Sequence, residues 1–504
     1  MSEERPHTRI AIVGGGTAGW MSAALLSNFV ASGDYSIELV ESDQIGTVGV
    51  GEATIPQINL YNEALGIDEA EFLAATMGTY KLGIEFVDWT RRGHRYMHAF
   101  GDVGRDVGIV PFHHYWHRAR ELGLAEELGS YSLNETAARE GKMQRGSLKT
   151  TNVVPPMPYA FHFDASLYAA YLRRLAEQRG VKRTEGRITG VERDGESGDV
   201  TRVVLGDGRE VEADLFLDCS GFAALLIGRE LQSGFEDWSN WLPCDRALAV
   251  PCASLPSITP YTRSTAREAG WQWRIPLQHR TGNGHVYCSE FLSDEEAKSR
   301  LMDGLDGEAL AEPRQLAFKA GMRRKAWSHN VVAIGLSSGF LEPLESTSIH
   351  LIQSALSRLL KMLPRGKGDP AIAAEFNRQS AEEYEGIRDF IILHYKATER
   401  DDTEFWKHCA AMDIPDKLAE RIDLFREAGH LFRHGEELFT VVGWLQVLIG
   451  QGVVPRQHHP LVDNVERADL QSYMQTFQSL LQREAAQMPD HAELIAQYGA
   501  AKAA

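Results

Sequence analysis

The sequence has few cysteines, no excess of basic residues and no long apolar segment. Its five cysteines in 504 residues show no Cys-x-x-Cys spacing, which argues for reduced thiols and against a disulfide framework. The formal net charge of −18 disfavours nucleic acid and anionic membranes as partners, because both bind basic surfaces. No apolar run is long enough to span a bilayer, and the polar N-terminus lacks the apolar core of a signal peptide. We therefore expect a cytoplasmic protein.

The length and the periodicity divide the chain into two parts. A chain of 504 residues exceeds the usual size of one domain. Residues 1–365 alternate strand-like apolar runs with helical segments, whereas helical periodicity dominates after a glycine-containing loop near residue 366. We predict a first domain over 1–365 and a mainly helical subdomain over 366–504.

A glycine-rich turn near the N-terminus predicts a dinucleotide site. The pattern G-x-G-x-x-G spans residues 14–19, between an expected strand at 9–13 and an expected helix at 17–30, and the next strand ends in an acid. Such glycines let the backbone approach a pyrophosphate at the helix N-terminus, while the acid binds ribose hydroxyls. The candidate cofactor-binding residues here are Gly14, Gly16, Thr17, Ala18, Gly19 and Glu41.

Later segments favour FAD over NAD. Residues 187–218 alternate around two Asp-Gly turns and predict a β-meander that ends in a buried strand, and another strand is expected at 331–334. FAD domains insert β-structure in this way and return late in the chain to the flavin. We predict an α/β fold: an FAD-binding two-dinucleotide-fold domain of the flavin monooxygenase type with a β-meander, followed by the helical subdomain.

One position departs from the flavin-dependent aromatic hydroxylases that share this layout. Those enzymes usually have an aspartate after the late glycine of the FAD domain. Here Leu336 follows Gly335. We expect the flavin to be held differently from the hydroxylase pattern, with Leu336 as one of its contacts.

Six stretches resemble the flavin-dependent halogenases of the tryptophan-halogenase type. They extend over most of the chain, and the W-x-W-x-I-P pattern is highly specific to this family. The bacterial subgroup that acts on indole and related small aromatics is the closer match. The stretches are GGGTAGW (14–20), VGVGEATIP (48–56), YKLGIEF (80–86), LDCSGF (217–222), WQWRIP (271–276) and LEPLESTSIH (341–350).

The resemblance implies a two-component enzyme. A separate reductase supplies reduced FAD, and oxygen and a halide ion, chloride or bromide, give hypohalous acid. This acid crosses an internal tunnel to a lysine, matched here by Lys81, and halogenates an electron-rich aromatic with the help of a glutamate, matched by Glu345. A tunnel-facing lysine would be desolvated, which favours its neutral amine.

The residues after Glu345 predict a helix whose N-terminus could bind the halide. Apolar residues recur at helical spacing from 349 to 363, and Pro364 ends the pattern. Free backbone N–H groups at such an end attract anions, so Thr347 and Ser348 are the candidate halide site. A plain N-cap is the alternative reading, since serine and threonine are favoured there regardless of function.

The resemblance assigns further residues to the flavin and to the wall of the tunnel. Gly49, Ala53 and Thr54 match a mobile strap over the flavin. Trp271 and Trp273 match a tryptophan pair between flavin and substrate. Two core tryptophans on one strand face would show the same period-2 spacing.

Other residues bear on the substrate. His98 and Phe100 match positions that sandwich an indole ring, although a core histidine is an equal alternative for His98. The region 436–444 lacks the tyrosine pair with which tryptophan-specific members grip the amino acid. We therefore expect indole, a substituted indole or a larger aromatic rather than free tryptophan.

Two remaining questions concern metal ions and alternative functions. His113 and His117 are spaced i, i+4 and could face one ion, but we see no supporting ligand and expect no metal. Two alternatives to a halogenase remain: a flavin-dependent aromatic monooxygenase and a non-catalytic FAD-binding protein. The family makes a homodimer possible.

Overall fold

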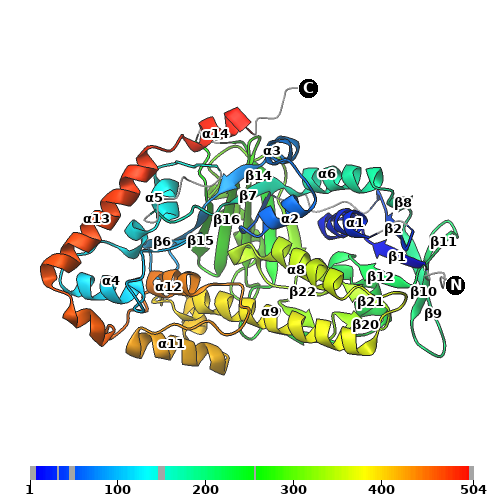
Figure 1. The fold of residues 1–504 in the computed structure, drawn as a ribbon. Coiled ribbons are helices and arrows are strands. Elements are labelled where there is room, and N and C mark those ends of the chain that lie inside the picture. Colours follow the sequence, from blue (N-terminus) through cyan, green and yellow to red (C-terminus); the bar gives the residue numbers. More distant parts are fainter. Residues whose placement is uncertain (1–6, 31–32, 45–50, 146–153, 255–256, 499–504) are drawn as a thin grey trace, which may run out of the picture.

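Two large sheets, one mostly parallel and one mostly antiparallel, follow each other along the molecule (Figure 1). This computed structural model describes residues 7–30, 33–44, 51–145, 154–254 and 257–498. The parallel sheet carries the glycine-rich turn. Its strands, in spatial order, are β20 (Trp327–Ser328), β21 (Val331–Ala333), β12 (Leu215–Asp218), β1 (Thr8–Val13), β2 (Tyr35–Glu41) and β8 (Lys182–Glu185).

Strand β1 is apolar throughout because both of its faces are covered. Ile10 and Ile12 belong to the core cluster that includes α1 (Thr17–Phe29), whereas Ala11 and Val13 belong to the cluster that includes β10 (Val200–Leu205) of the meander. Only β20 runs antiparallel to its neighbour. The expected strands and the helix after the turn are confirmed to within one or two residues.

The expected meander is confirmed as a separate antiparallel sheet. Its strands β9 (Ile188–Arg193), β10 (Val200–Leu205) and β11 (Glu210–Glu212) lead into β12. The chain therefore inserts β-structure between the strands of the parallel sheet, as the FAD-domain prediction required.

The second large sheet has seven strands and supplies the other side of the site. It is antiparallel except for the pair β15–β5. Its order is β18 (Arg314–Ala317), β14 (Arg246–Cys252), β17 (Thr281–Tyr287), β16 (Gly270–Pro276), β15 (Thr262–Arg267), β5 (Gly83–Val87) and β6 (Arg95–Ala99).

Two small sheets complete the β-structure of the described residues. One contains β3 (Gly51–Ala53), β7 (Ala160–Asp164) and β4 (Thr79–Lys81), and the other contains β13 (Phe235–Asp237), β19 (Gly321–Arg323) and β22 (Gly339–Phe340). In the first of them, Ala53 on β3 and Lys81 on β4 lie on the two strands that flank β7.

The C-terminal part is helical, as predicted. The longest helix, α9, contacts β20 of the parallel sheet and also α12, so it runs along both halves of the molecule (Figure 1). The proposed boundary at 365 falls between α8 and α9 and remains a prediction. The helices are α2 (Ile58–Ala64), α3 (Glu69–Thr76), α4 (Phe112–Glu121), α5 (Leu133–Arg139), α6 (Ala165–Gln178), α7 (Asp294–Asp303), α8 (Ser348–Lys361), α9 (Pro370–Lys396), α10 (Glu404–Ala411), α11 (Asp416–Ala428), α12 (Val441–Gly450), α13 (Arg467–Ala486) and α14 (His491–Tyr498).

Among the residues that the structure describes, no helix is both long enough and apolar enough to cross a membrane.

The parallel sheet predicts a clear difference between two leucines. Leu217 on β12 is 0% exposed, whereas Leu60 on α2 is 67% exposed. Leu217→Ala should lower the free energy of unfolding by about 2–5 kcal/mol because it leaves a cavity, and Leu60→Ala should change it by less than about 0.5 kcal/mol. Urea titration followed by circular dichroism measures both. Equal losses in the two variants would contradict this packing.

Candidate active site

A cavity of about 930 Å³ lies beside the glycine-rich turn and between the two large sheets. Most of the residues predicted to bind the cofactor line it. Gly19 and Thr54 do not, and Gly49 lies outside the described residues. The predicted residues that line the cavity are Gly14, Gly16, Thr17, Ala18, Glu41, Ala53, Trp271, Trp273, Leu336 and Ser348.

The backbone of the turn requires its glycines. Gly14 has φ = +114°, and a Cβ there would collide with the carbonyl oxygen of Cys219. A Cβ on Gly19 would collide with the carbonyl oxygen of Gly14, so Gly19 allows the close approach of helix and strand rather than contact with a ligand. No side chain caps α1 at Gly16, which leaves its backbone N–H groups free toward the cavity. An uncapped helix end in a large cavity fits the pyrophosphate of a flavin dinucleotide.

Glu41 lies at the end of β2, where an acid for the ribose was expected. Its Oε1 is 2.5 Å from Nε of Arg183, and Glu41 also lines the cavity. The guanidinium fixes one carboxylate oxygen, and the other can accept a hydroxyl hydrogen bond. Arg183 therefore holds the carboxylate of Glu41 in place, and one of its oxygens can still bind a ribose hydroxyl.

The two tryptophans lie on β16 and both line the cavity. Their ring centroids are 6.1 Å apart. Trp271 is fully buried, and its Nε1 donates a 2.6 Å hydrogen bond to Oε2 of Glu342. The two tryptophans form part of the cavity wall and also pack in the core. The predicted role as a wall and the alternative of two core tryptophans on one strand face are therefore compatible.

Lys81, at the end of β4, is completely buried behind this cavity. Its Nζ donates hydrogen bonds to the carbonyl oxygen of Thr54 at 2.9 Å and to Oγ of Ser346 at 2.8 Å. Burial lowers the pKa of Lys81 to about 7, although the nearby charge of Glu345 opposes the shift. A substantial fraction of the side chain is therefore a neutral amine near neutral pH.

Glu345 lies on the Lys81 side and is held by two histidines. Its Oε2 is 2.8 Å from Nδ1 of His98, and its Oε1 is 2.9 Å from Nε2 of His394. Burial opposes ionisation, but the charges and hydrogen bonds of the two imidazoles outweigh it and lower the pKa of Glu345 to about 2. The carboxylate is thus ionised and fixed in place.

The turn between Glu345 and α8 separates the cavity from the side on which Glu345 lies. Ser346 has φ = +59°, in the left-handed region, and it lines the cavity together with Ser348, whereas Glu345 does not. Thr347 is fully buried, and no side chain caps α8 at this position. The first N–H groups of α8 are therefore available to an anion at the edge of the cavity, and the N-cap alternative finds no capping hydrogen bond.

Aromatic rings gather on the far side of Glu345. Phe100 lies beside Lys81, with Nζ 5.4 Å from its ring centroid. His98 packs 5.5 Å from the ring of Phe390, and the stacked rings of Phe390 and Phe439 are 3.7 Å apart. The predicted substrate residues therefore contact the predicted catalytic pair: Phe100 lies beside Lys81, and His98 beside Glu345. The C-terminal helical part contributes the further rings of Phe390 and Phe439.

Several contributors to this site were not singled out from the sequence. His394 and Tyr395 come from the end of α9, and nothing in the local sequence marks them. Tyr395 donates a 2.6 Å hydrogen bond to the same oxygen of Glu342 that Trp271 contacts. Burial raises the pKa of Glu342 to about 7, even though the hydrogen bonds from Tyr395 and Trp271 oppose the shift. Ser346 is a further contributor, because its hydroxyl oxygen accepts a hydrogen bond from Lys81.

The expectation about supporting ligands near His117 was wrong. His113 is occupied by a hydrogen bond between its Nε2 and the carbonyl oxygen of Gly429, at 2.7 Å. Glu121 and His458 instead lie beside His117, with potential ligand atoms all within 4.8 Å of one another. Glu121 follows His117 by four residues on α4, so its i, i+4 spacing was visible in the sequence, whereas His458 is distant in sequence and no spacing could reveal it.

The glycine cradle, the inserted meander and the late return of the chain to the cavity define a flavin-dependent enzyme with the two-dinucleotide fold. The family profile described as tryptophan halogenase matches residues 9–467, and the chain belongs to this family. It is 36% identical over 485 residues to the tryptophan 6-halogenase SttH of Streptomyces toxytricini, a match that covers 90% of this chain and 91% of that protein.

Solved structures agree with this assignment. Xcc4156, a flavin-dependent halogenase from Xanthomonas campestris, is 49% identical, with a TM-score of 0.96 and coverage of 99% of this chain and 100% of that one. BrvH, a flavin-dependent halogenase from Brevundimonas sp. BAL3, is 44% identical, with a TM-score of 0.93 and coverage of 98% and 99%. The predicted family and fold class are confirmed.

The lowered pKa of Lys81 predicts a specific dependence of stability on pH. The unfolded chain keeps this proton up to about pH 10.5, whereas the folded chain releases it near pH 7. Between these values the unfolded state binds more protons, so the free energy of unfolding rises with pH, by about 1 kcal/mol per pH unit from this group. Lys81→Met should lack that rise.

Denaturant titrations at pH 7, 8 and 9 measure the difference between wild type and Lys81→Met. Lys319, whose side chain is 61% exposed, provides a matched control, and Lys319→Met should follow the wild type. If the curves of wild type and Lys81→Met run parallel, Lys81 remains charged in the folded protein and this account of the site fails.

Proposed function

We propose that this enzyme halogenates an electron-rich aromatic, with Lys81 relaying the halogen from the flavin cavity to the substrate. The observation that carries the proposal is the position of Lys81. Its amine is hydrogen-bonded to Ser346, which lines the cavity, while Glu345 and the substrate-side residues lie beyond it. Members of this family depend on a separate flavin reductase, which we propose as the transient partner here.

The cofactor supplies only the oxidising step. When bound, reduced FAD passes two electrons to O2, and with a halide ion X⁻ and a proton this yields HOX, oxidised FAD and water. We place the halide at the backbone N–H groups of Thr347 and Ser348, since the uncapped end of α8 opens on the cavity. The helix dipole stabilises an anion there.

Lys81 then holds the halogen. Its neutral amine can accept a hydrogen bond from HOX, or can displace hydroxide from it to give a haloamine and water. A charged ammonium has no lone pair and cannot form the haloamine. The pKa of about 7 therefore suits the residue to this step, and Ser346 and the carbonyl oxygen of Thr54 orient its nitrogen.

Glu345 acts on the substrate side. Attack of the aromatic ring on the electrophilic halogen forms a carbon–halogen bond and a cationic ring, which must lose one proton. The ionised carboxylate is placed to accept it. Its two imidazole partners fix its orientation and account for its retained charge in a buried position.

The substrate that this geometry favours is an indole or a related small aromatic. His98, Phe100 and Phe390 offer flat apolar faces near Glu345, and aromatic stacking suits such a ring. SttH is named for tryptophan, but residues 436–444 of this chain lack the tyrosine pair that grips an amino acid in the tryptophan-specific members. Chloride and bromide are both candidate halides.

Product masses test this function. The enzyme is incubated with FAD, NADH, a generic flavin reductase, oxygen, and either chloride or bromide, over a panel of indoles and tryptophan. We expect products with the halogen isotope pattern, reduced by about 100-fold or more in Lys81→Ala and Glu345→Gln, since each loses a group of the reacting centre. Lys319→Ala is the matched control and should keep full activity.

Other product patterns would change the conclusion. Products with added oxygen but no halogen would indicate the monooxygenase instead. Normal halogenation by Lys81→Ala would refute the relay, and loss of FAD binding in Glu345→Gln would make the glutamate structural.

A further inference from the structure

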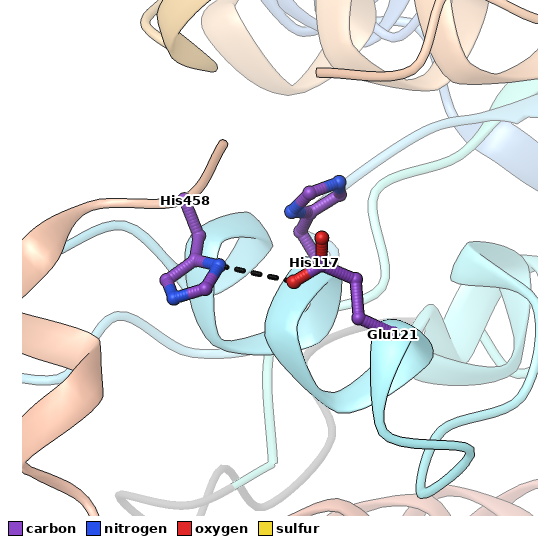
Figure 2. A group of neighbouring side chains, drawn as sticks. All are labelled: His117, Glu121 and His458. Atoms are coloured by element: carbon purple, nitrogen blue, oxygen red, sulfur yellow. Dashed lines mark ion pairs between the residues drawn. The ribbon is translucent and has the colours of Figure 1, made fainter. Parts of the chain in front are cut away.

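Three side chains that the halogenation site does not use converge at the other end of the molecule. His117 and Glu121 are one turn apart on α4, and His458 belongs to the segment between α12 and the short helix at Pro460–Asn464. One potential ligand atom of each lies within 4.8 Å of the others. Figure 2 shows His458 facing the two side chains of α4, and Figure 1 shows α4 at the end remote from the parallel sheet.

His117 presents a free nitrogen lone pair to this point. The side chain is 5% exposed, and its Nδ1 is buried without a hydrogen-bond partner. The ring is hydrogen-bonded to the carbonyl oxygen of Pro455, and a carbonyl can only accept, so the nitrogen that donates is Nε2. In a neutral imidazole Nδ1 is then unprotonated. An unpaired buried lone pair is costly unless something binds it.

His458 is oriented in the same way by a carboxylate. Its Nε2 is 2.8 Å from Oδ1 of Asp463, which is the arrangement that fixes the tautomer of metal-binding histidines. Its Nδ1 then faces Oε2 of Glu121 at 3.2 Å, without the geometry of a hydrogen bond. When His458 is neutral, Nδ1 and Oε2 present two lone pairs to each other, and a cation between them, either a proton or a metal ion, removes the repulsion.

We propose that His117, Glu121 and His458 bind one divalent transition-metal ion, for which Zn²⁺ is the best match. Two imidazole nitrogens and one carboxylate oxygen are a common zinc donor set, with water in the fourth position. Ligand atoms around zinc are about 3.4 Å apart, so the site must contract by about 1 Å. Glu121, whose side chain is 50% exposed, is free to make this movement.

The ion would connect two parts of the chain that are far apart in sequence. The segment 451–459 follows α12, and Gln446 of α12 is hydrogen-bonded to the backbone of Ala99, next to His98. A metal at His458 would anchor the end of this segment to α4. We therefore expect a structural ion that stabilises the helical wall of the substrate side, and no direct part in the chemistry.

Metal titration of the full chain, without a histidine tag and after treatment with EDTA, tests the proposal. We expect one Zn²⁺ per chain, a visible absorption band of tetrahedral type when Co²⁺ replaces it, and a higher melting temperature that EDTA reverses. Mg²⁺ should produce none of these effects, because it prefers oxygen ligands and octahedral geometry.

Variants locate the ion. Glu121→Gln and His458→Gln should weaken zinc binding by at least about ten-fold, and Asp463→Asn, which only loses the outer hydrogen bond, by about 10–100-fold. The exposed His434 is the matched control, and His434→Gln should bind zinc like the wild type. All of these variants keep His117, which is the most buried of the three proposed ligands.

Three results would overturn the proposal. They are absence of stoichiometric zinc binding, unchanged binding in both Glu121→Gln and His458→Gln, and loss of binding in His430→Gln alone. The first would mean that a proton on His458 satisfies both carboxylates, and the last would place the ion among the neighbouring histidines His114, His430 and His459.

Discussion

The left-handed conformation of Ser346 is the constraint on which the site depends. It reverses the chain between Glu345 and α8, so that neighbouring residues face opposite sides of one wall. Ser346 and Ser348 reach the flavin cavity, and Glu345 reaches the histidines and aromatic rings behind it. The hydrogen bond from Lys81 to Ser346 joins the two sides. A serine with φ = +59° is strained, and the strain is concentrated where the two halves of the proposed reaction meet.

Electrostatics around this turn follow from how the charge of Glu345 is shared. Both of its oxygens are committed to imidazoles, which lower its pKa to about 2. At Lys81 burial prevails and lowers the pKa to about 7, although the charge of Glu345 opposes the shift. The same carboxylate thus remains ionised while its neighbour becomes a neutral amine.

Local signals in the sequence were enough to predict the parallel sheet and the cofactor turn. The apolar run of β1, the glycines 14–19 and the helix after Thr347 depend on short-range rules of backbone geometry and burial, and the structure places them as expected. The resemblance identified Lys81 and Glu345, which the structure brings together.

The remaining features depend on contacts between distant segments. His394 reaches Glu345 only because α9 extends along both sheets, and His458 meets His117 through a loop that follows α12. No periodicity or spacing encodes such pairings. The hydrogen bond from Lys81 to the carbonyl oxygen of Thr54, a residue expected in the strap over the flavin, is of the same kind.

We propose that oxidation of the halide and its use on the substrate occur on opposite sides of the Ser346 turn. The most direct test is a single turnover of the Lys81→Ala variant with reduced FAD, oxygen and bromide, with indole present and a β-diketone in solution to trap released hypobromous acid. We expect brominated trap, no brominated indole and flavin reoxidation at the wild-type rate. If the variant brominates indole as the wild type does, or makes no hypobromous acid at all, the two sides are not separate and Lys81 is not the relay.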